Sequence, residues 1–253
     1  MQRNIPKTGS QCHILTPRHG RPSLRATNNM CGRFNQTASP EVIAQQFALD
    51  DPPLFKPRYN IAPSQPIAAI RIEPDTTTRK LVLLRWGLIP SWAKDTKIGN
   101  QCINAKAETV AEKSSFRSAF KKRRCLVITT GFYEWQVRGA VKQPMLIGLQ
   151  SKRPFAFAGL WEHWKPTEGE PIESCTIITT EPNDLMASIH NRMPVILAPA
   201  SYDQWLDPTF QNIETLNGLL RPYPSEELTA FPVSTLVNNP RHDAPQCLEP
   251  VSV

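Results

Sequence analysis

The chain has 253 residues, of which 40% are hydrophobic and 20% are charged, and it carries a net charge of +7. This composition is that of a folded domain with a hydrophobic core, and it excludes collagen-like, mucin-like and wholly disordered chains. No run approaches the roughly 18 consecutive apolar residues that a membrane helix needs, so we expect no membrane span.

The positive charge is concentrated at the N-terminus. Residues 1–29 hold five Lys or Arg side chains and no acid, whereas the rest of the chain holds 24 cationic and 22 acidic side chains. This polar, proline-containing stretch predicts an unstructured basic leader, either an over-long reading frame whose true start is Met30 or a pro-segment that is removed. A nucleic-acid site must then rest on local patches. Residues 121–124, four consecutive cations, are one candidate, and a solvated helix end is the alternative.

The first regular element is a helix that begins after Ser39. Ser39 is a favourable N-cap, Pro40 occupies the first helical position, and Ile43 and Phe47 lie one turn apart. Runs rich in Val, Ile, Thr and aromatic residues then predict mainly strands, with a few short helices between them. The predicted strands are residues 67–72, 80–86, 125–130, 132–137, 144–149, 155–160, 174–180, 195–197 and 231–237, and the predicted short helices are residues 183–190, 201–206 and 213–220.

These elements predict a single α+β domain over residues 30–241, followed by a C-terminal tail at 242–253. Its core is expected to be β-rich, barrel-like or built of packed curved sheets, with short helices at the periphery. The 25 prolines, about twice the usual share, indicate long and stiff connecting loops.

The six cysteines are scattered, without a C-x-x-C pair or a histidine at a zinc-finger spacing. We therefore expect no metal site and no cofactor. A secretory signal is absent, which indicates a reducing, cytoplasmic location, nucleoid-associated if the protein acts on DNA, and free thiols. Cys102, Cys125 and Cys175 lie in apolar stretches and are predicted to be buried as small hydrophobic residues.

Cys31 can react with an aldehyde if it is the N-terminal residue. If Met30 is the first residue and is removed, Cys31 becomes a free N-terminal 1,2-aminothiol. An α-amine has a pKa of about 7.7–8, so a sizeable fraction is neutral near pH 7 and can attack an aldehyde. The neighbouring thiol can then close on the imine to form a five-membered thiazolidine. An internal cysteine cannot do this, because its nitrogen is an amide.

Four further segments combine polar side chains with apolar neighbours. Glu134 lies between aromatic residues, an environment that raises the pKa of a carboxyl group and suits it to proton transfer near neutral pH. A histidine and an arginine stand where a helix must stop before a proline, and a tryptophan-rich loop can either fill the core or stack on bases. One segment places an amide and a cation close together, Asn104 and Lys106. The histidine and arginine are His190 and Arg192, and the tryptophan-rich loop contains Trp86, Pro90 and Trp92.

The order of these motifs resembles the SRAP family, the SOS-response-associated peptidase-like or abasic site processing proteins. The resemblance covers Met30 to about Arg241. It rests on Met-Cys-Gly-Arg-Phe at 30–34, Arg-Tyr-Asn-Ile-Ala-Pro at 58–63, Trp-Gly-Leu-Ile-Pro at 86–90, Ile-Asn-Ala-Lys-Ala-Glu-Thr at 103–109, Gly-Phe-Tyr-Glu-Trp at 131–135 and Ile-His-Asn-Arg-Met-Pro at 189–194.

The resemblance implies a β-rich domain with a positively charged groove for single-stranded DNA, which traps abasic sites as a covalent DNA–protein cross-link. It implies that Cys31 is the nucleophile, that Asn104 positions the amine and the sugar, that Glu134 moves protons, and that His190 assists opening of the sugar and reversal of the adduct. The positions that resemble the DNA-contacting set are Arg33, Asn60, Trp86, Pro90, Lys106, Thr179 and Arg192.

Three features depart from the family pattern. Lys106 stands where many relatives have Arg, and Asn191 stands where an acid is frequent. Residues 1–29 block the amine of Cys31, so the chemistry requires a start at Met30 or cleavage before Cys31, which the protein can perform on itself through Cys31, Glu134 and His190. The same imine predicts a β-elimination (lyase) side reaction, because it acidifies the neighbouring carbon of the sugar.

Two alternatives remain open at this stage. The first is a thiol peptidase or hydrolase that acts on other molecules with Cys31, His190 and Glu134 as its catalytic groups. The second is a non-catalytic single-strand DNA-binding protein that uses Trp86, Trp92 and basic residues.

Overall fold

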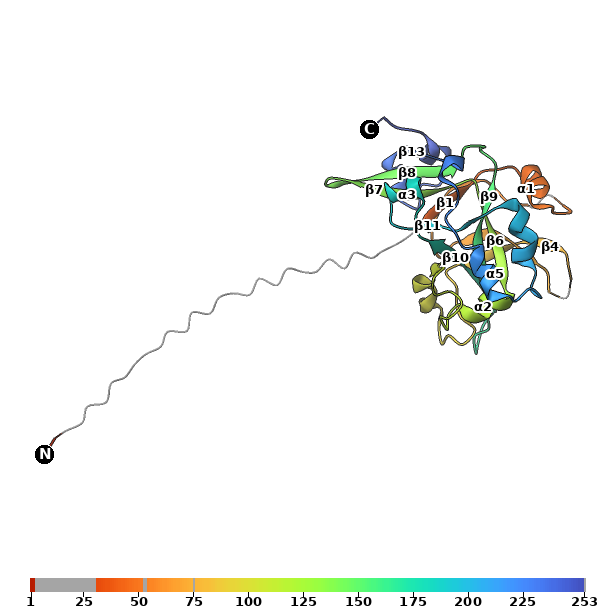
Figure 1. The fold of residues 1–253 in the computed structure, drawn as a ribbon, viewed down its shortest axis with the longest axis horizontal. Coiled ribbons are helices and arrows are strands. Elements are labelled where there is room, and N and C mark those ends of the chain that lie inside the picture. Colours follow the sequence, from red (N-terminus) through yellow and green to blue (C-terminus); the bar gives the residue numbers. More distant parts are fainter. Residues whose placement is uncertain (3–30, 52–53, 75, 253) are drawn as a thin grey trace.

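The chain folds into two curved β-sheets with short helices around them (Figure 1). The computed structural model describes residues 1–2, 31–51, 54–74 and 76–252. The predicted leader lies outside the described residues, apart from its first two. The architecture confirms the expected β-rich α+β class with short peripheral helices.

Five strands of the larger sheet close into a barrel. Strand β10 pairs with β4 in parallel and with β9 in antiparallel orientation, and β3 and β6 complete the ring between β4 and β9. Three short strands, β5, β11 and β12, extend this sheet. The bounds are β3 Pro66–Ile72, β4 Arg79–Trp86, β5 Asn104–Lys106, β6 Arg124–Thr129, β9 Phe155–Trp164, β10 Ile172–Thr180, β11 Met193–Pro194 and β12 Ile196–Leu197.

The smaller sheet has the strand order β13-β8-β7-β1-β2. Strands β7 and β8 form a hairpin, and β1 pairs with β7 over Arg33↔Tyr133, Phe34↔Phe132 and Asn35↔Gly131. The start of β1 therefore lies beside the middle of β7. The bounds are β1 Arg33–Gln36, β2 Arg58–Ile61, β7 Gly131–Arg138, β8 Val141–Leu149 and β13 Leu228–Pro232.

The helices are short and follow local capping rules. In α1, Ser39 Oγ accepts from the Val42 N–H, and Ile43 and Phe47 are fully buried, as the sequence predicts. The bounds are α1 Pro40–Phe47, α2 Arg117–Lys122, α3 Asp184–Ala187, α4 Tyr202–Leu206 and α5 Ile213–Gly218, with 3₁₀ segments at Thr96–Gln101, Pro199–Ser201, Ser225–Glu227, Thr235–Asn238 and Pro245–Leu248.

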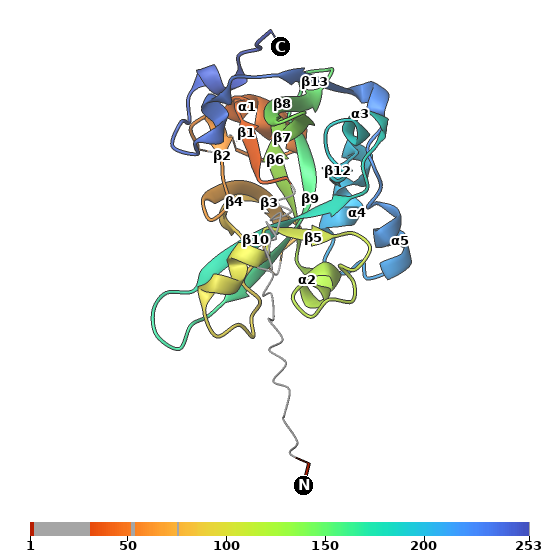
Figure 2. The ribbon, with the colours of Figure 1, turned by 90° about the vertical axis from the view of Figure 1, so that its left-hand side faces the viewer.

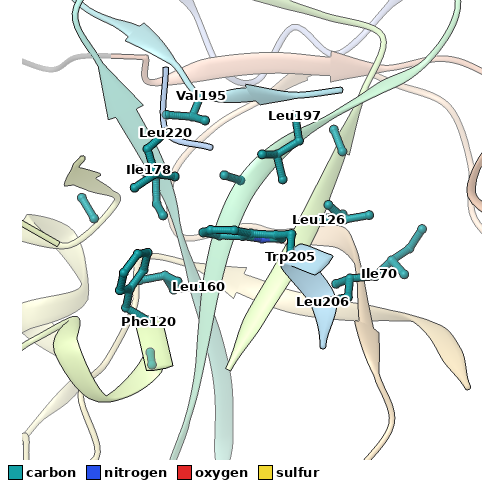
Figure 3. Close-up of a cluster of buried hydrophobic side chains, with 14 of the residues drawn as sticks. Ile70, Phe120, Leu126, Leu160, Ile178, Val195, Leu197, Trp205, Leu206 and Leu220 are labelled. Carbon is teal, nitrogen blue, oxygen red and sulfur yellow. The ribbon is translucent and has the colours of Figure 1, made fainter. Parts of the chain in front are cut away.

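Two large apolar clusters make up most of the core. One packs helices against the barrel: Figure 3 shows the Trp205 ring lying among Leu126, Leu160 and Leu197, and its Nε1–H donates to the Cys125 carbonyl at 3.0 Å. The other lies beneath the start of β1 and contains edge-to-face aromatic pairs that involve Phe34, Trp86, Phe132, Phe155 and Phe157. The ends of β1, β4 and β7 are thus fixed on one packed base.

Most predicted strands and helices are present with slightly different ends, but the expectation at 231–237 is wrong in part. Strand β13 ends at Pro232, and a 3₁₀ segment, Thr235–Asn238, follows. Residues 242–252, predicted as a tail, pack on the domain: Cys247 is 1% exposed, Asp243 pairs with Arg58, and Pro250 bridges to Val233. Cys102, Cys125 and Cys175 are buried free thiols, as expected.

The cationic run 121–124 is partly structural. Arg124 is 2% exposed, and its guanidinium donates to the backbone carbonyls of five residues, which are Phe120, Lys121, Trp205, Asp207 and Phe210. Arg123 pairs with Glu162. Lys121 and Lys122 alone remain exposed at the end of α2. The run therefore joins α2 and α4 to the barrel.

We expect Arg124→Met to lower the free energy of unfolding by at least about 3 kcal/mol, because it leaves several buried carbonyl groups without a donor. Urea denaturation with a linear extrapolation measures this loss. Lys122→Met, at the exposed end of the same helix, is the matched control and should change stability by under about 0.5 kcal/mol. Equal effects of the two substitutions would contradict the structural assignment.

Candidate active site

Cys31 and Glu134 are joined at the point where β1 begins. The Cys31 backbone N–H donates to Glu134 Oε1 at 2.7 Å, and the two residues are 1% and 2% exposed. The contact follows from the register, because Arg33 lies opposite Tyr133 and side chains alternate along a strand. Cys31 has φ +34°, in the left-handed region that side chains other than glycine rarely adopt. A Cβ at Gly32 would meet nothing within 4 Å, so space is open beside the pair.

Burial sets the protonation of both groups. Desolvation raises the pKa of Glu134 to about 8, although the backbone N–H groups of Cys31 and Trp135 act in the opposite direction. Desolvation and the nearby negative charge of Glu134 both raise the pKa of the Cys31 thiol well above its usual range. Near neutral pH the carboxyl group can therefore give or take a proton, while the thiol keeps its own.

Asn104 approaches Cys31 from the other sheet. Strand β5 runs parallel to β10, with Asn104 opposite Ile177, and Asn104 Nδ2 donates to the Cys31 carbonyl at 3.4 Å. Figure 2 shows β5 crossing close to β10 on this side of the molecule. An amide from the barrel and a carboxyl group from the small sheet thus meet at one residue.

Trp86 connects the two sides of this site from beneath. Its side chain is fully buried, and its Nε1–H donates to the Ile103 carbonyl at 2.9 Å, immediately before Asn104. Its ring packs edge-on against Phe34 of β1, with centroids 5.2 Å apart. Trp86 therefore positions the strand that carries Asn104 and the strand that follows Cys31.

His190 lies in the loop that follows α3, beside the outer part of β7. Gln136 of β7 donates to the Ser188 carbonyl at 2.9 Å, and His190 Nδ1 accepts from the Arg192 N–H at 3.2 Å. Burial lowers the pKa of His190, and the positive charge of Lys142 acts in the same direction, whereas the Arg192 carbonyl oxygen, 3.4 Å from Nδ1, opposes them because it can accept from the protonated ring. Among the described residues, the imidazole has no hydrogen bond to Cys31 or Glu134.

Two of the predicted DNA-contacting residues are cations that lie around β5. Lys106 is exposed and shares a face of β5 with Asn104. Arg192 donates to the Thr179 carbonyl at 2.6 Å and forms a bidentate pair with Glu108, which sequence reasoning missed. Burial lowers the pKa of Arg33, whose Nη1 donates to Asn60 Oδ1 at 2.8 Å. Asn60, Trp86, Pro90 and Thr179 are buried.

The exposed member of the tryptophan-rich loop is Trp92. Its side chain is 58% exposed, and its Nε1–H donates to the Ser114 carbonyl at 3.4 Å. Hydropathy alone does not separate Trp86 from Trp92. The strand pattern before Trp86 is the signal that places Trp86 in the core, since β4 ends there.

Across residues 1–2, 31–51, 54–74 and 76–252, no group of three or more His, Cys, Asp or Glu side chains has the arrangement of a metal site. No helix within these ranges is long and apolar enough to cross a membrane.

Comparison with known proteins assigns this chain to one family. The family model for SOS response associated peptidase (SRAP) matches residues 30–240. The abasic site processing protein YoqW of Bacillus subtilis is 46% identical over 224 residues, which cover 87% of this chain and 99% of the relative. The abasic site processing protein HMCES of Gallus gallus is 34% identical over 229 residues, 79% of this chain and 68% of the relative.

Solved structures show the same fold. A protein of Bacteroides thetaiotaomicron superimposes with a TM-score of 0.79 at 28% identity, covering 88% of this chain and all of the other. A protein of Bordetella bronchiseptica gives a TM-score of 0.70 at 26% identity, covering 81% of this chain and 100% of the other. The chain belongs to the SRAP family.

The buried Glu134 predicts a pH effect on stability. Its pKa in the folded chain is about 8, above the usual value of 4.5, so the folded state binds more protons and stability falls as pH rises between these values. The unfolding free energy of the protein minus that of Glu134→Gln should therefore become more negative by a few kcal/mol from pH 5 to pH 8.5, because the glutamine cannot ionise. Urea denaturation at several pH values measures it. A difference independent of pH would show that Glu134 is ionised throughout.

Proposed function

We propose that this protein captures abasic sites in single-stranded DNA by forming a thiazolidine between the aldehyde of the opened sugar and an N-terminal Cys31. The observation that carries the proposal is the 2.7 Å contact between the Cys31 nitrogen and the buried Glu134 carboxyl group. When Cys31 is the first residue, that nitrogen is an α-amine with a proton acceptor beside it. The names of the relatives, abasic site processing proteins, support the same substrate.

The first step joins the amine to the aldehyde carbon. Glu134 accepts a proton from the α-ammonium group, the freed lone pair adds to the carbonyl carbon, and a carbinolamine forms. Glu134 then returns the proton to the carbinolamine hydroxyl, which leaves as water, and the iminium ion gives its N–H proton back to the Glu134 carboxylate to form the imine. A carboxyl group whose pKa lies near neutrality suits both transfers.

The second step closes the ring. The Cys31 thiol adds to the imine carbon, its proton moves to the nitrogen, and the product is a thiazolidine with the loss of one water molecule overall. Asn104, which contacts the Cys31 carbonyl, holds the residue and orients the sugar. His190 assists opening of the sugar and reversal of the adduct. Loss of a C2 proton from the same imine starts the β-elimination side reaction.

Binding of the strand is assigned to side chains that surround the site. Lys106, Arg192 and Arg33 neutralise phosphates without reading sequence, and no base has to be flipped because the abasic residue has none. The exposed Trp92 stacks on a neighbouring base. Asn60, Trp86, Pro90 and Thr179 shape the binding surface from beneath, since their side chains are buried.

Residues 1–30 have to be absent for this chemistry. If translation starts upstream, the Cys31 thiol adds to the Met30 carbonyl carbon and its proton moves to the carbonyl oxygen. The C–N bond then breaks as Glu134 protonates the departing Cys31 nitrogen and takes up the hydroxyl proton of the intermediate, and water hydrolyses the thioester and restores the thiol. The positive φ of Cys31 supports this route, because cleavage removes the backbone strain.

A denaturing gel tests the proposal with three proteins: one that starts at Cys31, the full chain, and a Cys31→Ser variant of the first. Each is incubated with single-stranded DNA that carries one abasic site. We expect a heat-stable, slower band from the protein that starts at Cys31 and none from the serine variant. The mass of the full chain before and after incubation shows whether the leader has been removed.

Other outcomes separate the alternatives. A band that disappears on denaturation, with salt-sensitive binding to intact and abasic DNA alike, would establish a plain DNA-binding protein. Cleavage of added peptides by the full chain, with its leader still attached, would establish a peptidase that acts on other molecules. Scission of the DNA strand at long incubation reports the lyase side reaction.

Glu134→Gln in the protein that starts at Cys31 should slow adduct formation by about 10²-fold or more, because the amide cannot move protons. Affinity for an unreactive tetrahydrofuran analogue of the abasic site should stay within about twofold. Quenched time points on a denaturing gel give the rate, and fluorescence anisotropy gives the affinity. A parallel loss of rate and affinity would assign Glu134 to binding instead.

A further inference from the structure

The β7–β8 hairpin continues well beyond the point where β1 stops pairing with it. The described pairing of β1 with β7 reaches only Arg33↔Tyr133, whereas β7 and β8 stay paired as far as Arg138↔Val141. Figure 1 shows the end of this hairpin projecting past the body of the domain. The outer half of the hairpin, residues 135–142, therefore extends away from the reaction site like an arm.

One face of the arm leads directly out of the site. Every second residue of a strand points to the same face, so Glu134, Gln136 and Arg138 share one face of β7. Successive members of this row are roughly 6.8 Å apart along the strand. Arg138 Nε donates to Gln136 Oε1 at 2.7 Å, and Gln136 in turn holds the Ser188 carbonyl of the loop that carries His190. Side-chain contacts thus connect the arm to the loop that carries His190, and the arm begins next to Glu134 along β7.

The arm is short and contains no acidic side chains. Its turn contains only Gly139 and Ala140, and Gly139 has φ +59°, which a tight hairpin requires. Residues 135–161 contain no Asp or Glu, and Arg138 and Lys142 are exposed at the outer end. Lys142 lies near enough to His190 to lower the pKa of that imidazole.

Apolar side chains are exposed beside these cations. Val137 is 67% exposed and Val141 62%, on opposite faces of the tip. Apolar surface in water costs free energy that a partner recovers on binding. A single DNA strand offers both phosphates, which cations bind, and unpaired bases, which apolar side chains contact. The bases of a duplex are paired and stacked, so a duplex matches this surface less well.

We propose that the outer half of the β7–β8 hairpin binds the single-stranded DNA that flanks one side of the abasic site. Arg138, on the face that Glu134 shares, contacts one phosphate, and Lys142, on the opposite face, contacts another where the strand crosses the tip. This inference rests on the proposed function and adds a direction to it. The strand leaves the reaction site along β7 on one side only, because the arm extends from the site in one direction. The arm is therefore a binding surface for flanking nucleotides and takes no part in the chemistry.

The test uses two oligonucleotides with an unreactive tetrahydrofuran abasic analogue. One carries about eight nucleotides only on the 5′ side of the analogue, and the other carries them only on the 3′ side. Fluorescence anisotropy compares the protein that starts at Cys31 with its Arg138→Gln and Arg138→Gln/Lys142→Gln variants. Lys152→Gln/Arg153→Gln removes the same charge just beyond the opposite end of β8 and is the matched control.

We expect the hairpin variants to lose affinity for one of the two oligonucleotides only, roughly fivefold for each phosphate contact at 0.1 M salt. The dependence of log K on log salt for that oligonucleotide should flatten by about 0.7 for each contact. The control variant should bind both oligonucleotides as the parent does. Thermal unfolding of each variant verifies that the hairpin is intact.

Equal losses for both oligonucleotides, or no loss for either, would overturn the inference, and so would a loss equal to that of the control variant. Cross-linking to a reactive abasic site reports separately on the proposed function. If the parent forms the heat-stable adduct while the hairpin variants bind both oligonucleotides normally, the inference alone fails. If no adduct forms but the one-sided loss is present, the cross-linking proposal alone fails.

Discussion

The hydrogen bond between the Cys31 nitrogen and the buried Glu134 carboxyl group is the interaction around which this domain is arranged. An ionisable group at 2% exposure is costly to bury, and it persists only where its partners are fixed. The fixing comes from the register of β1 on β7 and from the aromatic cluster beneath both strands. A one-residue slip of β1 would turn Phe34 out of the core, so packing of the core and alignment of the site are the same constraint.

Several residues predicted to contact DNA also hold that alignment from inside. Asn60 Nδ2 donates to three backbone carbonyls of the segment 237–242, and Arg33 donates to two carbonyls at 237 and 238. Asp243 accepts from the Tyr59 and Asn60 N–H groups and pairs with Arg58. The C-terminal segment is thereby fastened across β2 and the beginning of β1. A polar residue in a family motif can thus act by positioning the backbone that carries the reactive group.

The fold was largely predictable because most of its strands have a clear local pattern. Strands such as β6 and β10 are long apolar runs, and α1 has an N-cap, a proline and a spaced apolar pair. The short strands β1, β2 and β5 could not be predicted, since three or four residues carry no detectable periodicity and exist only through their partners. The 3₁₀ segment at 235–238 replaces a predicted strand because side chains of β1, β2 and β7 bind its carbonyl and amide groups.

The site was predictable as a set of residues but not as an arrangement. The order of the motifs predicted that Cys31, Asn104, Glu134 and His190 form one site. In the structure, hydrogen bonds join the first three of these residues. Whether a motif residue faces solvent is a tertiary property. Trp86 is the last residue of β4 and Trp92 lies in the loop that follows; the first is fully buried and the second is 58% exposed. The hydrophobic pattern of β4 ends at Trp86, so it does not predict whether a side chain in the following loop is buried or exposed.

The state of the Cys31 nitrogen decides what Glu134 can do in the proposed reactions. While the nitrogen is an amide, the carboxyl group faces a neutral donor, burial dominates, and its pKa of about 8 keeps it protonated at pH 7. It is then a proton donor, which is what release of a leader requires. Once the nitrogen is an α-ammonium group, an opposite charge lies within hydrogen-bond distance and lowers the pKa of Glu134. The carboxylate becomes a proton acceptor, which is what addition of the amine to an aldehyde requires. In the proposed reactions one buried carboxyl group therefore serves as acid before processing and as base after it.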